Sequence, residues 1–394
     1  MTSTTAHRLV PALCVYLGGF VIGLTLVSFP ASSVVLRQLH HFSSEQYGAI
    51  YLPQLVASVI GALAGGALAR RVSLRAMFAV ALLAFALAAA LLALSAQVSP
   101  GLALALIMAG TASFGFGFGF GGGPLNAFAA LLFPRHQGAA LTALHMCAGS
   151  GLTVAPVLFA ALAGHGLWWV GPSALAATSG ALFLLTMTAT FPAPAQDDAA
   201  AADAVHPGRT ALFWLCAVIA MLYSVAEGTF SNWATVFLTE ERGLSAADAA
   251  LALTCFWAAL TGGRLIATLL AARLTPAVFL IALPCAMAAA LLWLPGIADA
   301  AQAYGGFAAA GLACSAFFPM LVAFTAARAP QAISWIASML TAAMMVGVGL
   351  GSYAVGALRG GASIASLYGY ATAVPVACLL CVALAVALSR RSPA

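Results

Sequence analysis

Apolar residues occur in long uninterrupted blocks that are separated by short polar segments. Residues 77–96 and 278–294 are examples, and each block is about as long as a helix that crosses a membrane. In lipid every backbone polar group must be satisfied within the protein, so only helices and closed barrels can span it. Barrel strands alternate apolar and polar residues, whereas these blocks do not. The pattern therefore predicts an all-α membrane protein.

The polar interruptions divide the chain into a series of predicted transmembrane helices. The longest interruption, residues 191–210, is rich in Pro, Ala and Asp, which is typical of a flexible linker. It predicts an N-terminal six-helix half at residues 1–190 and a C-terminal six-helix half at residues 211–394. The 12 predicted helices are residues 9–30, 46–69, 76–96, 101–132, 138–163, 167–190, 211–238, 246–271, 277–296, 301–326, 332–357 and 364–388.

Composition argues against a soluble protein and against an enzyme. Hydrophobic residues make up 64% of the chain and charged residues only 6%, whereas a soluble domain carries roughly 25% charged residues. The basic excess consists of arginines scattered over the loops, so no nucleic-acid partner is expected. The eight cysteines lie in apolar stretches, and the C-x-x-C at Cys378 and Cys381 has no second ligand pair, so neither disulfides nor a metal site is predicted.

The glycine-rich run at residues 114–123 does not predict a phosphate-binding loop. It lacks the Gly-Lys-Ser/Thr ending, and the chain contains no lysine. Gly115, Gly119 and Gly123 instead recur every four residues, which favours close approach of another helix. No ATP-binding motif is present elsewhere, so we expect no cofactor, and any active transport must be secondary.

The distribution of arginines predicts the orientation in the membrane, because cytoplasmic loops are enriched in positive charge. With both termini inside, the outer loops hold only Arg37, Arg242 and Arg359. The short loops and the alanine- and arginine-rich, lysine-free composition favour a bacterial inner membrane. The predicted cytoplasmic segments hold Arg8, Arg70, Arg71, Arg75, Arg135, Arg209, Arg273, Arg328, Arg390 and Arg391.

The two halves repeat each other at an offset of about 197 residues, which indicates a duplication. The matching elements are GGAL at 65–68 with GGRL at 262–265, GSGL at 149–152 with GVGL at 347–350, similar AALAG and GALRG segments after the latter pair, and Pro124 with Pro319. Parallel six-helix repeats resemble the major facilitator superfamily, whose members bind substrate between the halves near the middle of the membrane. The resemblance implies the major facilitator fold, and we expect a monomer.

The segment GALARRVSLR at residues 66–75 resembles the superfamily motif G-x-L-a-D-r-x-G-r-r between helices 2 and 3. Gly66, Leu68, Arg71 and Arg75 fit it, whereas Arg70 replaces the aspartate and serine replaces the second glycine. The resemblance implies that Gly66, Arg70, Arg71 and Arg75 form a gating motif that latches the outward-facing state. The replacement of the aspartate by Arg70 implies an altered latch.

Within the superfamily the chain resembles the fucose permease and related sugar–proton symporters. The resemblance lies in GGRLI at 262–266, Asn126, SAFFP at 315–319 and the segment 223–238, which contains a glutamate and a later aromatic residue. Two departures concern proton coupling: Leu26 and Gly122 stand where that group has a helix 1 aspartate and a helix 4 glutamate. The proton chemistry of the group therefore does not transfer to this chain.

Three ionisable side chains inside predicted spans are candidates for transport, because burying such groups in lipid is costly. Glu227 is the only acidic residue in mid-span, and burial there favours a carboxyl that gains and loses a proton. Alternatively, it is permanently ionised and paired with an arginine. Three interpretations of Arg264 are open: it binds an anionic group of a substrate, it neutralises Glu227, or its side chain extends to the inner interface of the membrane. Two interpretations of His145 are also open: it takes part in a proton relay, or it is a hydrogen-bonded packing residue.

Other polar side chains on apolar helices either line a substrate site or bridge helices. These are Asn126, Asn232, Gln54 and Thr25, together with Tyr223 and Trp233, which flank Glu227 and suit stacking on a sugar ring. The sequence thus predicts a secondary transporter that moves a sugar or other small polar solute together with protons by alternating access. Two alternatives remain open, a proton-driven exporter of drugs or hydrophobic metabolites and an uncoupled uniporter or receptor.

Overall fold

The computed structural model describes residues 3–69, 71–192, 207–271, 273–329 and 332–391. Helices make up most of these ranges, and no strand occurs within them. Among the described residues, 12 helical segments are long and apolar enough to cross a membrane. They coincide with the predicted spans to within a few residues, and the all-α membrane fold predicted from the sequence is confirmed.

The helices form two sets. The first set comprises α1 (Ser3–Ala31), α2 (Ser33–His40), α3 (Ser44–Ala49), α4 (Tyr51–Leu68), α5 (Leu74–Leu94), η1 (Ser95–Gln97), α6 (Pro100–Leu132), α7 (Gln137–Gly164) and α8 (Val170–Thr188). The second set comprises η2 (Pro207–Arg209), α9 (Ala211–Val236), η3 (Phe237–Glu241), α10 (Ala246–Leu270), α11 (Pro276–Trp293), η4 (Leu294–Gly296), α12 (Ala300–Ser315), α13 (Phe317–Ala326), α14 (Ile333–Leu358), α15 (Ile364–Ala371) and α16 (Ala373–Arg391).

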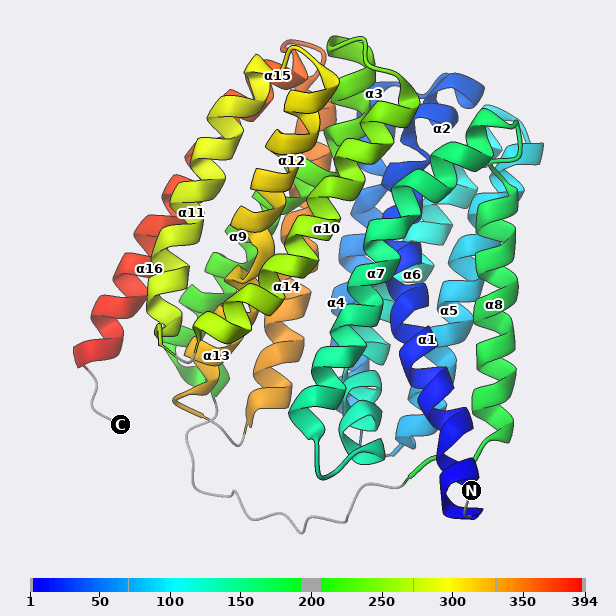
Figure 1. The fold of residues 1–394 in the computed structure, drawn as a ribbon, viewed down its shortest axis with the longest axis vertical. Helices are drawn as coiled ribbons and strands as arrows, with labels where there is room; N and C mark the ends of the chain where they lie inside the picture. The colour runs from blue at the N-terminus through cyan, green and yellow to red at the C-terminus, as the bar shows by residue number, and fades with distance from the viewer. Residues whose placement is uncertain (1–2, 70, 193–206, 272, 330–331, 392–394) are drawn as a thin grey trace.

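The two sets stand side by side, with α1–α8 on the right and α9–α16 on the left in Figure 1. The start of α1 and the end of α16 both lie at the lower end of the bundle in this view, and we call the opposite end the upper end. The division at residues 191–210 stays a prediction, because residues 193–206 lie outside the described ranges.

Glycines bring the helix backbones into direct contact, and the same helix pairing recurs in both sets. In the first set α1 packs on α7, where a Cβ added to Gly151 would lie 2.2 Å from the carbonyl oxygen of Phe20. In the second set α9 packs on α14, where a Cβ on Gly347 would lie 2.1 Å from the carbonyl oxygen of Met221. Gly151 and Gly347 lie in the matched GSGL and GVGL segments, although at the third and the first position respectively, so the repeat corresponds to the same pairing of helices through different glycines.

The glycine-rich run forms part of the long helix α6, as its spacing predicts. A Cβ on Gly115 or on Gly119 would lie 2.2 Å from a carbonyl oxygen of α4, that of Gln54 or of Ser58. Gly123, the third member of the series, has no atom within 4 Å of the added Cβ. Only the upper part of the run is therefore required for the contact between α6 and α4.

The two matched prolines have different consequences. Pro124 lies inside the continuous helix α6, whereas Pro319 follows the break at Ala316 that separates α12 from α13. Proline has no backbone N–H, so Pro319 cannot donate the helical hydrogen bond to the carbonyl of Ser315 four residues earlier. That carbonyl is left available to a side chain, which positions the candidate site described next.

Candidate functional site

Glu227 lies in the middle of α9, and its side chain is buried, with 8% of its surface exposed. Tyr223, one helical turn earlier, donates a hydrogen bond of 3.0 Å to the carbonyl oxygen of Cys314 on α12. Arg264 on α10 is close enough to interact electrostatically with both Glu227 and Tyr223. The ion pairs found within 4 Å in the described ranges involve other residues, so Glu227 and Arg264 are neighbours that do not form a direct pair.

Arg264 is positioned by the break between α12 and α13. Its Nε donates a hydrogen bond of 3.3 Å to the carbonyl oxygen of Ser315, the group that Pro319 leaves without a helical donor. Gly263 allows α12 to approach α10 at this point, because an added Cβ would lie 2.5 Å from the Ser315 hydroxyl oxygen. The local sequence of both helices therefore fixes where the guanidinium group lies.

His145 reaches the same region from the first set of helices. It lies on α7, its side chain is exposed, and it interacts electrostatically with Arg264 on the facing helix α10. The two helices touch one turn away, where a Cβ on Gly149 would lie 2.3 Å from the Thr261 side chain. Of the candidates predicted from the sequence, the structure thus brings Tyr223, Glu227, Arg264 and His145 together, and we call these four residues the central cluster.

The other five candidates lie elsewhere and make local or bridging contacts. Three of them make these hydrogen bonds: Asn126 donates to the Gly122 carbonyl at 2.8 Å, Thr25 to the Val21 carbonyl at 2.8 Å, and Gln54 to the Met345 sulfur at 3.9 Å. Asn232 and Trp233 both bond to Ser352 of α14, at 2.7 Å and 3.0 Å. None of these hydrogen bonds reaches the central cluster, and a role in substrate binding stays a prediction for all five.

Two residues next to the cluster were not among the predicted site residues. Trp257 and Thr261 are buried on α10, with 4% and 7% of their surfaces exposed. Neither the Trp257 Nε1 nor the Thr261 Oγ1 has a hydrogen-bond partner in the described part of the chain. Trp257, Thr261 and Arg264 are separated by four and three residues, which places all three on one face of the helix. This spacing can be read from the sequence, so it could have indicated these two residues as neighbours of Arg264.

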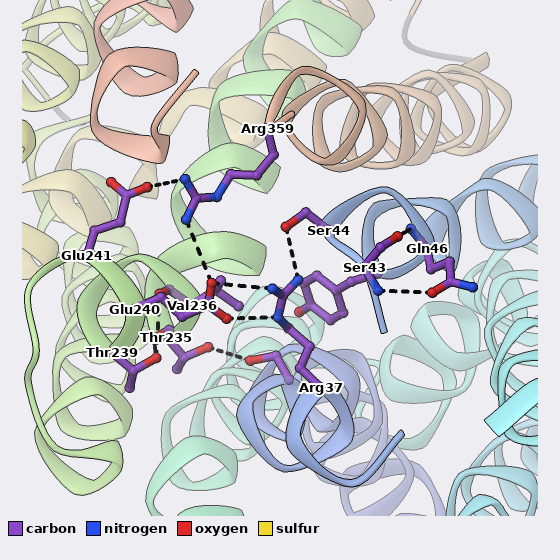
Figure 2. A network of polar contacts seen from close by, with 12 residues as sticks. Arg37, Ser43, Ser44, Gln46, Thr235, Val236, Thr239, Glu240, Glu241 and Arg359 are labelled. Carbon is purple, nitrogen blue, oxygen red and sulfur yellow. Dashed lines mark hydrogen bonds and ion pairs between the residues drawn. The ribbon is translucent and has the colours of Figure 1, made fainter. Parts of the chain in front are cut away.

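Charged residues cross-link the upper end of the bundle (Figure 2). Arg37 of α2 donates from Nε to Glu240 at 2.9 Å, and Arg359 after α14 contacts Glu240 at 3.7 Å and Glu241 at 2.6 Å. The Glu241 carboxylate also accepts the first two backbone N–H groups of α15, at 2.6 Å and 3.0 Å. We call Arg37, Glu240, Glu241 and Arg359 the upper-end network; the sequence indicated only that these charges lie in loops.

Uncharged contacts between the two sets lie below this network. The hydroxyls of Ser33 and Thr235 are 2.6 Å apart, and Tyr47 donates to the Asn232 carbonyl at 3.0 Å. The lowest of the hydrogen bonds that join the sets within the described ranges are those from Thr254 to the Thr153 carbonyl and from Gln54 to Met345. The two sets are therefore joined through their upper halves, and no hydrogen bond between described residues joins their lower ends.

The predicted gating motif lies at the lower end. Gly66 has no atom within 4 Å of an added Cβ, and Arg71 is exposed. Arg75 donates a hydrogen bond of 3.2 Å to the Ala189 carbonyl oxygen, which ties the start of α5 to the end of α8. Arg70 lies outside the described residues, so the latch stays a prediction.

In the described ranges, neither a metal centre nor a pocket adds a member to the central cluster. They contain no group of three or more His, Cys, Asp and Glu residues that could hold a metal ion. A pocket of about 360 Å³ lies between α7 and α10 near the upper end, and its lining contains no member of the central cluster. The lining residues are Val157, Ala160, Ala161, Gly164, His165, Ala247 and Ala250.

Comparison with known proteins agrees with this arrangement. A family model described as Major Facilitator Superfamily matches residues 12–340. Comparison with curated protein sequences gives no significant match.

Among solved structures, the chain is similar to a D-xylose–proton symporter, with a TM-score of 0.75 and 14% identity over 96% of this chain and 97% of that one. It is also similar to the nucleoside transporter NupG, with a TM-score of 0.69 and 18% identity over 96% and 98% of the chains. A third similar structure is the transporter FucP in the outward conformation, with a TM-score of 0.67 and 18% identity over 98% and 99%. At these identities the similarity shows a common fold.

Proposed function

The chain belongs to the major facilitator superfamily, and from that premise we propose that it moves a small polar metabolite across the membrane by secondary active transport. The superfamily resemblance seen in the sequence is thereby confirmed, and the protein is a multi-pass membrane transporter rather than an enzyme. The similar structures include a sugar–proton symporter and a nucleoside transporter. Both support a polar solute, with a sugar as the leading class.

The observation that supports proton coupling is the burial of Glu227 without a direct ion pair. It is a buried carboxyl in mid-span that no direct ion pair fixes in the charged form, and Arg264 lies close enough to respond to its charge. A carboxyl in such a place changes its protonation when a substrate or a helix movement changes its surroundings. Glu227 is the proposed proton carrier, and Arg264 and His145 are the proposed partners in the relay.

The contacts between the two helix sets support alternating access. The upper halves are joined by the upper-end network and the hydrogen bonds beneath it, whereas the lower ends lack such bonds in the described ranges. We propose that the protein is a monomer in a bacterial inner membrane, with the lower end and both termini in the cytoplasm. The arginine distribution supports this orientation. In that orientation the structure is closed to the outside, and the upper contacts must break to let solute enter from there.

The test uses Glu227→Gln, which keeps the size of the side chain and removes its titration. In proteoliposomes with a pH gradient, uptake of radiolabelled D-xylose, fucose, uridine and gluconate is measured, and the wild-type protein is expected to accumulate at least one of them. The variant is expected to lose accumulation and to retain exchange of labelled for unlabelled solute. Glu45→Gln is the matched control, because Glu45 is exposed in the first turn of α3.

Each alternative function gives a different result in the same assay. An uncoupled uniporter or receptor would show no dependence on the pH gradient, and Glu227→Gln would lower only its thermal stability. An exporter would transport lipophilic cations rather than the polar solutes. The exporter is the second candidate because apolar residues dominate the buried surroundings of the cluster, including Phe256 and Phe317.

A further inference from the structure

The guanidinium group of Arg264 is only partly satisfied by the protein. Its Nε bonds to the Ser315 carbonyl, while its two terminal nitrogens make no hydrogen bond or ion pair within 4 Å with any described residue. A guanidinium inside a membrane span is costly unless an anion accompanies it. The Nε contact orients the group and leaves the two terminal nitrogens available, and these form the fork that binds a carboxylate with two parallel hydrogen bonds.

The titratable groups around Arg264 come from three helices. Glu227 and Tyr223 lie on α9, Cys314 lies on α12, and His145 lies on α7. Glu227 is the only acidic residue among them, since the other acidic residues of the chain lie in loops or at helix ends. When Glu227 is protonated, the guanidinium therefore has no anion beside it within the spans.

The same face of α10 offers further hydrogen-bond donors. Thr261 lies between Arg264 and Trp257 on this face, and both the Trp257 Nε1 and the Thr261 Oγ1 are buried without a partner in the described ranges. Buried polar groups of this kind are almost always satisfied by a protein group, water or a ligand. A solute that carries a carboxylate and neighbouring oxygen atoms matches this row of donors.

We propose that the transported solute is a small monocarboxylate, which Arg264 binds directly and whose charge it balances in place of that of Glu227. This inference rests on the proposed proton-coupled transport. Arg264 neutralises one carboxylate at a time, so binding of the solute requires protonation of Glu227. One proton therefore accompanies each solute, and transport is electroneutral. A phosphate monoester, with about two negative charges at neutral pH, exceeds what this single buried arginine neutralises.

The binding test compares acids with neutral molecules of matched shape. Thermal shift of the full chain in detergent is measured with lactate and 1,2-propanediol, gluconate and sorbitol, benzoate and benzyl alcohol, and glucose 6-phosphate. At least one carboxylate is expected to raise the unfolding temperature while its neutral partner and the phosphate do not. Arg264→Gln removes the effect. Arg264→Lys keeps the charge and weakens binding about tenfold or more, because the two-pronged geometry is lost.

Arg135→Gln is the matched control, since Arg135 is an exposed arginine at the lower end, and it leaves the shift unchanged. Stabilisation by the neutral partners or by the phosphate overturns the proposal, as does equal stabilisation of Arg264→Gln by the carboxylates. The absence of stabilisation by every carboxylate also overturns it.

Transport in proteoliposomes separates this proposal from the proposed function. Uptake of the bound carboxylate is expected to acidify the lumen and to be unaffected by a potassium diffusion potential. Glu227-dependent acidification driven by a neutral polyol leaves proton-coupled transport standing and overturns the carboxylate proposal. If a carboxylate binds in an Arg264-dependent way but its transport moves no proton, the proton coupling is overturned. The proposal that Arg264 balances the solute carboxylate only when Glu227 is protonated is then overturned as well.

Discussion

The closest contact of a glycine with a backbone atom of the opposite helix set predicts a single substitution that opens the upper end. Gly356 of α14 packs on Gly48 of α3, and a Cβ on Gly356 would lie 2.5 Å from the Ser44 carbonyl oxygen and 3.0 Å from the Gly48 Cα. The carbonyl contact is so short that Gly356→Ala forces α14 and α3 apart. The substitution therefore penalises the closed upper end and leaves a state in which the sets have separated unaffected.

The size of the effect follows from the cost of overpacking. Inserting a methyl group into such a contact costs typically 1–3 kcal/mol, that is about 1–3 kcal/mol against the closed state here. Because only one state bears the cost, the equilibrium between closed and open upper ends shifts about 5- to 150-fold. The chain should remain folded, since the contact lies between the sets rather than within either of them.

Spin labels at the upper end measure this shift. Cysteines are placed at Leu39 and Ala298, exposed positions on opposite sets, after the eight native cysteines have been replaced. Gly356→Ala is expected to increase the fraction of long distances between the labels. Gly360→Ala is the control, because a Cβ there meets nothing within 4 Å. An unchanged distance distribution for Gly356→Ala in folded protein, or an equal change for Gly360→Ala, would refute the reasoning.

Two further substitutions test the packing and the upper-end network. Glu240→Gln removes the contacts of Glu240 with Arg37 and Arg359, and partly exposed pairs of this kind are worth about 0.2–1 kcal/mol each. The same spin labels should therefore show a smaller opening of the upper end than with Gly356→Ala. High salt should produce a similar opening in the wild type. If neither change alters the distances between the labels, the upper-end network does not hold the two sets together. Gly119→Ala should lower the unfolding temperature, because the added methyl group clashes with α4 at a cost of about 1–3 kcal/mol. Gly123→Ala is the control and should leave the unfolding temperature unchanged. Equal effects of the two substitutions would argue against the α4–α6 contact.

Much of the fold could be predicted because lipid imposes simple rules on sequence. Each span must be apolar over about 20 residues, so the blocks and their polar interruptions mark the helices directly. The cost of burying charge likewise singled out Glu227 and Arg264. The structure places them near each other without a direct ion pair, and their role in transport stays a prediction. The repeated glycines predicted close helix contacts, although the sequence could not show that Gly123 has no such neighbour.

The remaining features depend on distances that a single sequence does not contain. Asn232 and Trp233 bond to Ser352, which is over a hundred positions away, so a bridging role could not be told from a binding role. Arg37 of α2 and Glu240 of η3 are far apart in the chain, and their pairing follows only from the way the two sets meet. The free carbonyl of Ser315 was implicit in the proline four residues later, but its acceptance of Arg264 required the packing of α10 on α12.

Proton movement through Glu227 is the central claim, and a pH-sensitive dye inside proteoliposomes tests it most directly. External solute that has passed the binding screen is added without an imposed pH gradient, and lumenal pH is recorded for the wild type and for Glu227→Gln. We predict prompt acidification with the wild type and none with the variant, which should still exchange labelled solute. Solute uptake by the wild type without acidification, or acidification that persists in Glu227→Gln, would contradict the account.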